Sequence, residues 1–192
     1  LKDPEAQAVV RQLALQADVL IENFRPGAME SFNLDPEDIK RKITPRTKAI
    51  VPVHLFGQTA DMEPIMAIAK EHGLCVIEDN CQAIGGVHTG GDGTRRKSGT
   101  IGHIGTTSFF PSKNLGCYGD GGALFTNDET LAKKIRRVCN HGSDVRYYHE
   151  VIGVNSRLDS LQAAVLRIKL RHLDAYAAAR NAAATHYDKA FA

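Results

Sequence analysis

A strand, a helix and a second strand in close succession restrict the fold of this chain most. The apolar stretch from Ala49 to Leu55 is typical of a buried strand, MEPIMAIAKEH of a helix, and Leu74 to Ile77 of another buried strand. Such a unit is right-handed and places its strands parallel, and parallel sheets bind ligands at the carboxyl ends of their strands. We therefore predict an α/β fold in which Asp79, just after the second strand, lies at a ligand-binding edge.

Turn and capping residues delimit the other elements. Asp61 can cap the helix of this unit, and Gly73 can end it. The segment His88 to Gly99 (HTGGDGTRRKSG) is expected to be a polar loop. We predict further strands over residues 17–24, 104–110 and 123–126, and helices over residues 4–16, from Asp35, from Asp128 to about Cys139, and from Ser156, paired with Asp159 as its cap, to the C-terminus.

The composition excludes several classes of function. Lysine and arginine number 24 against 22 acidic residues, a net charge of +2, which is too balanced for a nucleic-acid-binding surface. No apolar run is long enough to cross a membrane. The four cysteines lack the C-x-x-C spacing of a zinc site, and His88, His103 and His141 lack ligand spacing. We expect a soluble cytoplasmic protein with no metal, no nucleic acid and no membrane among its partners.

The stretch SFFPSKNLGCYGDGGA places Lys113 between an apolar strand and a glycine-rich turn. Most lysines at such positions extend into solvent. A desolvated lysine is instead a nucleophile that forms Schiff bases with carbonyl compounds, as in pyridoxal phosphate enzymes, where a carboxylate also holds the pyridine nitrogen protonated. Lys113 and Asp79 have the side chains that this chemistry requires, and Ser108 and Ser112 can donate to a phosphate.

Three separated segments carry a family resemblance: VIEDNCQAIGG (Val76 to Gly86), the run from Gly99 to Asp128 that contains Lys113, and GVNSRLDSLQAAVL (Gly153 to Leu166). They resemble the DegT/DnrJ/EryC1/StrS family of pyridoxal-phosphate-dependent nucleotide-sugar aminotransferases, from about residue 32 to the C-terminus. The resemblance implies the large domain of a fold type I transferase, with a mostly parallel sheet and helices on both faces. It also implies transfer of an amino group from glutamate to a keto group of a UDP- or dTDP-linked sugar, for polysaccharide biosynthesis.

The resemblance assigns the cofactor contacts residue by residue. Lys113 corresponds to the Schiff-base lysine and general acid/base, and Asp79 to the partner of the pyridine nitrogen. Gln82 corresponds to the residue beside the cofactor ring, and Ser108 to a phosphate ligand. On this reading the glycines after Lys113 let the backbone turn closely beneath the bound ring. Taken without the family, Gln82 is a loop amide and Ser108 a strand-end serine.

Two further residues imply a homodimer with shared active sites. Asn155 resembles the asparagine that reaches the phosphate bound by the neighbouring subunit, and Arg157 resembles the arginine that contacts substrate across the dimer. Without the resemblance, both are capping or helix-surface residues.

The sequence departs from the family pattern at both ends. It lacks the N-terminal phosphate cradle and the small C-terminal domain, so the predicted large domain is incomplete. Residues 1–31, with the motif ENFRPG, resemble a segment of the family III (CaiB/BaiF) CoA-transferases. We therefore predict an appended segment over 1–31, the central part of the cofactor-binding domain over 32–155, and a long interdomain helix over 156–192. An inactive fragment that keeps the motifs, or CoA binding by residues 1–31, are the alternative functions.

Overall fold

The computed structural model describes residues 9, 12, 19–22 and 36–191 of the chain. These residues fall into two compact units, the N-terminal unit Leu1–Thr106 and the C-terminal unit Thr107–Ala192. The junction predicted near residue 31 lies outside the described residues, as does the helix predicted over residues 4–16 except for Val9 and Gln12, which are helical.

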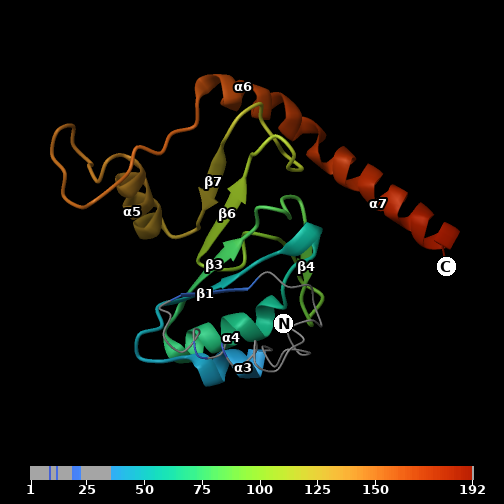
Figure 1. Ribbon diagram of the computed structural model, residues 1–192, viewed down its shortest axis with the longest axis horizontal. Coiled ribbons are helices and arrows are strands. Elements are labelled where there is room, and N and C mark those ends of the chain that lie inside the picture. Colours follow the sequence, from blue (N-terminus) through green and yellow to red (C-terminus); the bar gives the residue numbers. More distant parts are fainter. Residues whose placement is uncertain (1–8, 10–11, 13–18, 23–35, 192) are drawn as a thin grey trace. The chain divides into compact units, whose positions relative to one another are not determined.

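Parallel strands form the N-terminal unit, as the strand-helix-strand pattern predicts. Its strands β1, β2, β3 and β6 are successive neighbours in the sheet, and each is parallel to the next. Figure 1 shows α3 and α4 side by side within this unit. The elements are β1 (Val19–Glu22), α3 (Pro36–Lys42), β2 (Ala49–Pro52), the short helix η1 (Leu55–Gly57), α4 (Met62–His72), β3 (Cys75–Asp79) and β6 (Ile104–Ser108), whose last two residues belong to the C-terminal unit.

An apolar core holds α4 against the strands. Met62, Ile65, Ile68 and Ala69 form one buried face of α4, and they pack with a cluster that includes Val76 of β3. The helix ends where expected, since Gly73 adopts the left-handed conformation with φ of 64°. Asp61 precedes the helix as predicted, although its side chain makes no capping hydrogen bond.

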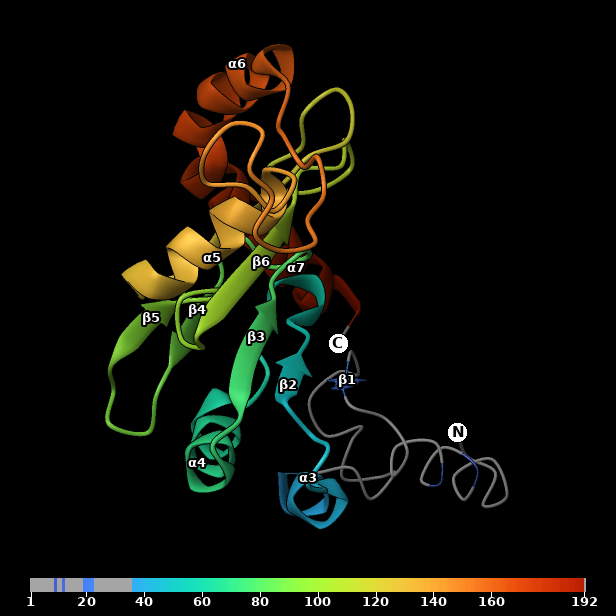
Figure 2. The ribbon, with the colours of Figure 1, turned by 90° about the vertical axis from the view of Figure 1, so that its left-hand side faces the viewer.

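Two parts of the N-terminal unit differ from the sequence expectation. The segment predicted as a polar loop forms an antiparallel hairpin of β4 (Val87–Thr89) and β5 (Arg95–Lys97), visible in Figure 2. Its turn is closed by the Asp92 side chain, which accepts from the Thr94 N–H at 2.8 Å. Strand β2 ends at Pro52 instead of continuing to Leu55, and the chain then turns through Phe56 at φ of 53°. Both outcomes depend on turn geometry, which the spacing of apolar residues does not indicate.

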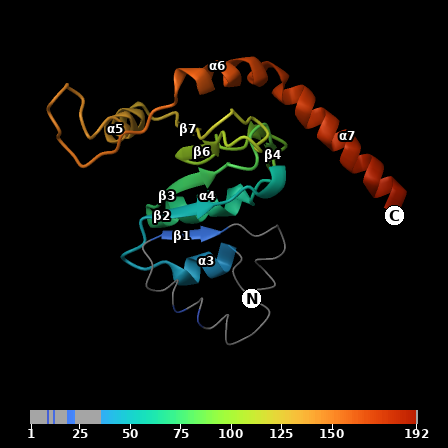
Figure 3. The same ribbon diagram turned by 45° about the horizontal axis from the view of Figure 1, so that its top comes forward.

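The C-terminal unit contains β7 (Gly122–Phe125), α5 (Glu129–Cys139), α6 (Ser160–Lys169), the short helix η2 (Leu170–His172) and α7 (Leu173–Phe191). Asp128 caps α5 as predicted, because its Oδ1 accepts from the N–H groups of Thr130 and Leu131. Figure 3 shows α6 leading through η2 into the long α7.

The long helix begins at Ser160, four residues later than predicted from Ser156. Asn155 forms an antiparallel bridge with Asn140, and the Ser156 N–H donates to the Cys139 carbonyl at 2.9 Å. These bonds keep the backbone at Asn155 and Ser156 extended, so the helix starts only after Asp159.

Neither a membrane-spanning helix nor a metal-binding cluster occurs among the described residues. Among them, no helix is both long and apolar enough to span a bilayer. The same residues contain no group of three or more histidine, cysteine or acidic side chains placed to hold a metal ion.

Candidate active site

Asp79, the predicted partner of a cofactor nitrogen, is held by its backbone at the carboxyl end of β3. Its carbonyl accepts from the His54 N–H at 3.0 Å, and on the other side it pairs with Thr106 of β6. Its carboxylate is half-buried, and Oδ1 accepts from the Cys81 N–H at 3.1 Å. Within the described part of the chain Oδ2 has no hydrogen-bond partner, so this oxygen can accept a proton-bearing group.

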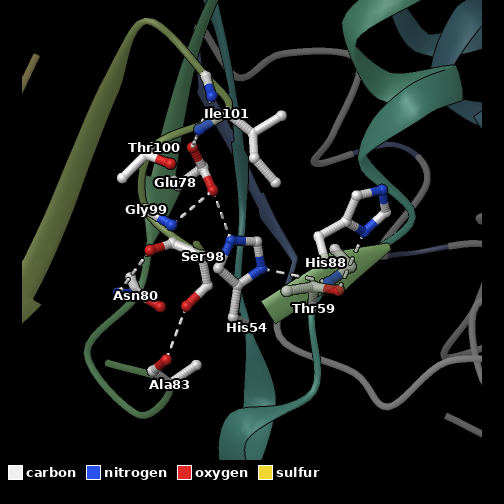
Figure 4. A network of polar contacts seen from close by, with 12 residues as sticks. His54, Thr59, Glu78, Asn80, Ala83, His88, Ser98, Gly99, Thr100 and Ile101 are labelled. Carbon is white, nitrogen blue, oxygen red and sulfur yellow. Dashed lines mark hydrogen bonds and ion pairs between the residues drawn. The ribbon is translucent and has the colours of Figure 1, made fainter. Parts of the chain in front are cut away.

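Glu78, the residue before Asp79, is completely buried and extensively hydrogen-bonded (Figure 4). Its carboxylate accepts from the backbone N–H groups of Gly99 at 2.8 Å, Ile101 at 2.6 Å and Gly102 at 2.5 Å. It also bonds to His54 Nε2 at 2.8 Å. Burial acts to raise the pKa of Glu78, but these hydrogen bonds outweigh it and lower the pKa below its usual value. Glu78 is therefore a buried carboxylate anion that fixes the loop over residues 99–102.

Ser98, which directly precedes this loop, holds the segment that follows Asp79. The Ser98 hydroxyl donates to the Ala83 carbonyl at 2.7 Å, and the Asn80 side-chain amide donates to the Ser98 carbonyl at 3.2 Å (Figure 4). Gln82, the predicted neighbour of a cofactor ring, lies in this segment and is half-buried. Glu78 thus indirectly supports the backbone that carries both Asp79 and Gln82.

In the C-terminal unit, Ser108 and Lys113 flank a tight turn. The Phe110 N–H donates to Ser108 Oγ at 3.2 Å, and the Lys113 N–H donates to the Phe110 carbonyl at 2.9 Å. The Ser108 oxygen acts as the acceptor, and the described residues include no acceptor for its O–H proton, so this proton can bond an external anion. Lys113 is half-buried, and in the part of the chain that the structure describes its Nζ forms no ion pair.

The glycines after Lys113 are required by the chain itself. A Cβ on Gly116 would lie 2.4 Å from the Pro111 carbonyl oxygen, and one on Gly122 would lie 2.8 Å from the Thr107 carbonyl oxygen. These contacts with backbone atoms account for both glycines without any bound ring. The sequence explanation, close approach to a cofactor, is therefore not needed at these positions.

Helix α6 supports the Lys113 turn through two side chains that sequence reasoning missed. Gln162 Oε1 accepts from the N–H groups of Tyr118 at 2.8 Å and Gly119 at 3.1 Å. Lys169 Nζ donates to the Gly116 carbonyl. In the sequence, the one sign of this role was that Gln162 is a polar residue near the start of a helix with an apolar stripe.

Arg157 lines an open cavity of about 410 Å³ in the C-terminal unit. Arg137 in this cavity is already neutralised, because it pairs with Asp144 and with Glu150, and the hydrogen bond to Asp144 is the main cause of its raised pKa. The structure describes no ion pair for Arg136 or Arg157, which leaves two cations for an anionic ligand. The lining residues are Arg136, Arg137, Cys139, Asn140, Ser143, Asp144, Ser156 and Arg157.

The predicted site residues are thus distributed over both units. Asp79 and Gln82 lie in the N-terminal unit; Ser108, Lys113, Asn155 and Arg157 lie in the C-terminal unit. Asn155 is exposed, and its backbone pairs with Asn140. The roles of these residues remain predictions.

Comparison with known proteins identifies the relatives of this chain. The profile of the DegT/DnrJ/EryC1/StrS aminotransferase family matches residues 27–192. The chain is 52% identical over 159 residues to a "pleiotropic regulatory protein" of Geobacillus stearothermophilus, covering 83% of this chain and 41% of the relative. It is 51% identical to the UDP-2-acetamido-2-deoxy-3-oxo-D-glucuronate aminotransferase of Pseudomonas aeruginosa, covering 82% of this chain and 43% of that protein.

A solved structure gives the same result. The chain superimposes on NtdA from Bacillus subtilis, solved with bound pyridoxamine phosphate, with a TM-score of 0.66 and 35% identity. The match covers 86% of this chain and 42% of that one. The predicted fold type I α/β architecture is confirmed, and the chain spans somewhat less than half the length of these relatives. No comparison supports the CoA-transferase resemblance of residues 1–31, and β1 from that segment pairs with β2 in the sheet.

Proposed function

This chain belongs to the DegT/DnrJ/EryC1/StrS aminotransferase family, and from this we propose that it forms part of an enzyme that aminates a nucleotide-linked keto-sugar. Glutamate is the proposed amino donor, and a keto group of a UDP- or dTDP-linked sugar is the acceptor. The observation that carries the proposal is the 51% identity to a UDP-sugar aminotransferase, a relation that includes the segments around Asp79 and Lys113. Relatives named for dTDP-linked sugars support the same reaction class.

The residues present fit pyridoxal phosphate. When bound, this cofactor supplies an electron sink that permits removal of a proton from the carbon bearing the amino group. Asp79 offers Oδ2, which has no partner in the described chain, to hold the proton of the ring nitrogen. Ser108 would donate its hydroxyl proton to the phosphate, and Lys113, whose amine forms no ion pair in the described residues, would hold the cofactor at its aldehyde group.

Lys113 is also proposed to move the proton of the carbon that bears the amino group. Its Nζ takes a proton from the donor amino acid as general base and returns it as general acid. Gln82 orients the ring from the segment that Ser98 fixes. Lys113 is half-buried and its amine forms no ion pair in the described residues, so the amine is available for this role.

Substrate recognition is assigned to the C-terminal unit. Arg157 lies at a cavity with Arg136, and neither forms an ion pair within the described residues; Arg157 is proposed to bind the negatively charged part of the nucleotide-sugar. Asn155 is proposed to reach the phosphate bound by a second copy, so that a homodimer forms shared sites. We place this chemistry in the cytoplasm, as expected from the sequence.

The test is binding of pyridoxal phosphate to the purified 192-residue chain. Borohydride reduction and peptide mapping should fix the cofactor on Lys113, and the visible absorbance of the complex should be absent in Lys113→Ala. Lys134→Ala, which removes an exposed lysine of α5, is the matched control and should behave as wild type. Absence of the absorbance from the wild type, or labelling spread over surface lysines, would overturn the proposal.

A bound cofactor then allows the substrates to be tested. Incubation with glutamate should convert the cofactor to its amine form, and UDP- or dTDP-linked keto-sugars should reverse the change. Alanine and aspartate serve as alternative donors, and keto-sugars without a nucleotide serve as alternative acceptors. Equal rates with these alternatives would contradict the assignment of glutamate and of the nucleotide.

A further inference from the structure

His54 bonds to both of two consecutive acidic residues. Its backbone N–H donates to the Asp79 carbonyl at 3.0 Å, and its imidazole Nε2 lies 2.8 Å from Glu78 Oε2. The ring is completely buried, as is the Glu78 side chain. His54, two residues after the end of β2, therefore fixes the last two residues of β3 through separate groups.

The remaining ring nitrogen determines which way the hydrogen bond to Glu78 runs. The Ala60 N–H lies 3.1 Å from His54 Nδ1, and a backbone N–H can only donate. Nδ1 therefore carries no proton, and Nε2–H donates to the Glu78 carboxylate. Such a second bond fixes the tautomer of a histidine, as is common for histidines that orient functional groups.

Glu78 and Asp79 point to opposite faces of the sheet, because successive side chains of a strand alternate. Burial follows this alternation, since Val76 and Glu78 are buried whereas Cys75, Ile77 and Asp79 are partly exposed. His54 consequently contacts the buried side of the strand and the Asp79 backbone, and it acts on the Asp79 carboxylate only through the main chain.

We propose that His54 is a positioning residue for the ring-nitrogen site: held by Ala60 and bonded to Glu78 and to the Asp79 carbonyl, it sets where the Asp79 carboxylate lies. This inference rests on the proposed function, in which Asp79 holds the proton of the cofactor nitrogen. The physical reason is that a misplacement of about 1 Å at a reacting or binding group can cost on the order of 10²-fold in rate. Glu78 itself is held in place, because its other hydrogen bonds are to backbone N–H groups of residues 99–102.

The experiment compares two buried histidines. His54→Leu removes both side-chain bonds of the ring, whereas His54→Gln keeps a side-chain donor toward Glu78. His88→Leu is the matched control, because His88 is 8% exposed and bonds to Thr59 instead of Glu78 or Asp79. Each variant of the full chain is titrated with pyridoxal phosphate and with its analogue in which carbon replaces the ring nitrogen.

We expect His54→Leu to weaken pyridoxal phosphate binding by about tenfold or more, within the range that misplacement of a contact produces. His54→Gln should recover most of this loss, and His88→Leu should bind within about twofold of wild type. With the carbon analogue, wild type and His54→Leu should bind alike, because Asp79 has no ring nitrogen to hold. Equal losses in His54→Leu and His88→Leu, or an unchanged loss with the analogue, would overturn the inference.

A double-mutant cycle with Asp79→Asn tests the same coupling. If His54 acts through Asp79, the loss caused by His54→Leu should largely disappear in the Asp79→Asn background. Additive losses would contradict a positioning role.

Hydrogen exchange separates this inference from the proposed function. In the absence of cofactor, His54→Leu should speed amide exchange at residues 79–83 and 99–102, and His88→Leu should not. If wild type binds no pyridoxal phosphate, the proposed function fails, and exchange still tests whether His54 holds the backbone around Asp79. If wild type binds and exchange is the same in both variants, the inference fails while the function stands.

Discussion

At the carboxyl end of β3 the backbone depends on a buried charge, whereas the Lys113 turn depends on backbone bonds, on glycine and on two side chains of α6. The Glu78 anion collects N–H groups from the loop over residues 99–102, and His54 completes its hydrogen bonding. The turn after β6 is closed by backbone bonds, by close contact at Gly116 and by the Gln162 amide of α6. The first region should therefore be sensitive to loss of charge, and the second to added volume.

The largest expected effect is that of Glu78→Gln. The amide that replaces the carboxylate cannot accept at its nitrogen, so buried N–H groups lose a partner and the charge is lost. We expect the free energy of unfolding to fall by about 3 kcal/mol, measured by urea denaturation. Asp79→Asn changes the adjacent carboxylate in the same way, yet it should alter stability by less than about 1 kcal/mol, since Asp79 is partly exposed. Equal losses in both variants would remove the distinction between the two acids.

Gly116→Ala tests the region that depends on close packing. Its Cβ would lie 2.4 Å from the Pro111 carbonyl oxygen, and this backbone atom cannot move without distorting the Lys113 turn. We expect a loss of about 1 to 3 kcal/mol in the free energy of unfolding, with faster amide exchange in the turn.

Gly119→Ala is the control, because its nearest neighbour is the flexible Gln162 amide nitrogen at 3.1 Å. It should cost less than Gly116→Ala. A larger loss of stability in Gly119→Ala than in Gly116→Ala would show that the turn accepts an added side chain even where backbone atoms are closest.

Lowering the pH should weaken the Glu78 region selectively. Hydrogen bonds lower the pKa of Glu78 in the folded chain below its usual value of 4.5, so the unfolded chain takes up this proton first as the pH falls. The stabilisation is present above about pH 4.5 and is lost as the pH falls toward the folded-state pKa. Urea midpoints measured from pH 7 to pH 3 should show a shallower decline in Glu78→Gln than in wild type, and parallel curves would contradict the assignment.

Gln162→Met should have the smallest effect. It removes the oxygen that accepts from the Tyr118 and Gly119 N–H groups, but water can replace it at the exposed Tyr118. We expect a loss of about 0.5 to 1.5 kcal/mol. Gln162→Glu keeps an acceptor oxygen and should lie closer to wild type. A loss in Gln162→Glu as large as in Gln162→Met would show that the amide, not the oxygen, matters.

Local patterns were sufficient for most elements. The spacing of apolar residues predicted α4 and the strands on either side of it, Gly73 marked the helix end, and Asp128 marked the start of α5. The patterns failed at Ser156, where the predicted helix start is held extended by the Cys139 carbonyl, and at the β4–β5 hairpin, whose polar residues show no apolar alternation.

For the candidate site, the sequence predicted residue types and placed Asp79 at a strand end, but it gave no reason to connect Glu78 with His54. These residues are 24 positions apart, and Gln162 lies 44 positions from Tyr118. The sequence by itself determined the family and the order of most elements, because periodicity and motifs are local along the chain. Only the tertiary structure decided which buried groups meet, because a polar group out of contact with water must bond to whatever the fold brings within about 3 Å.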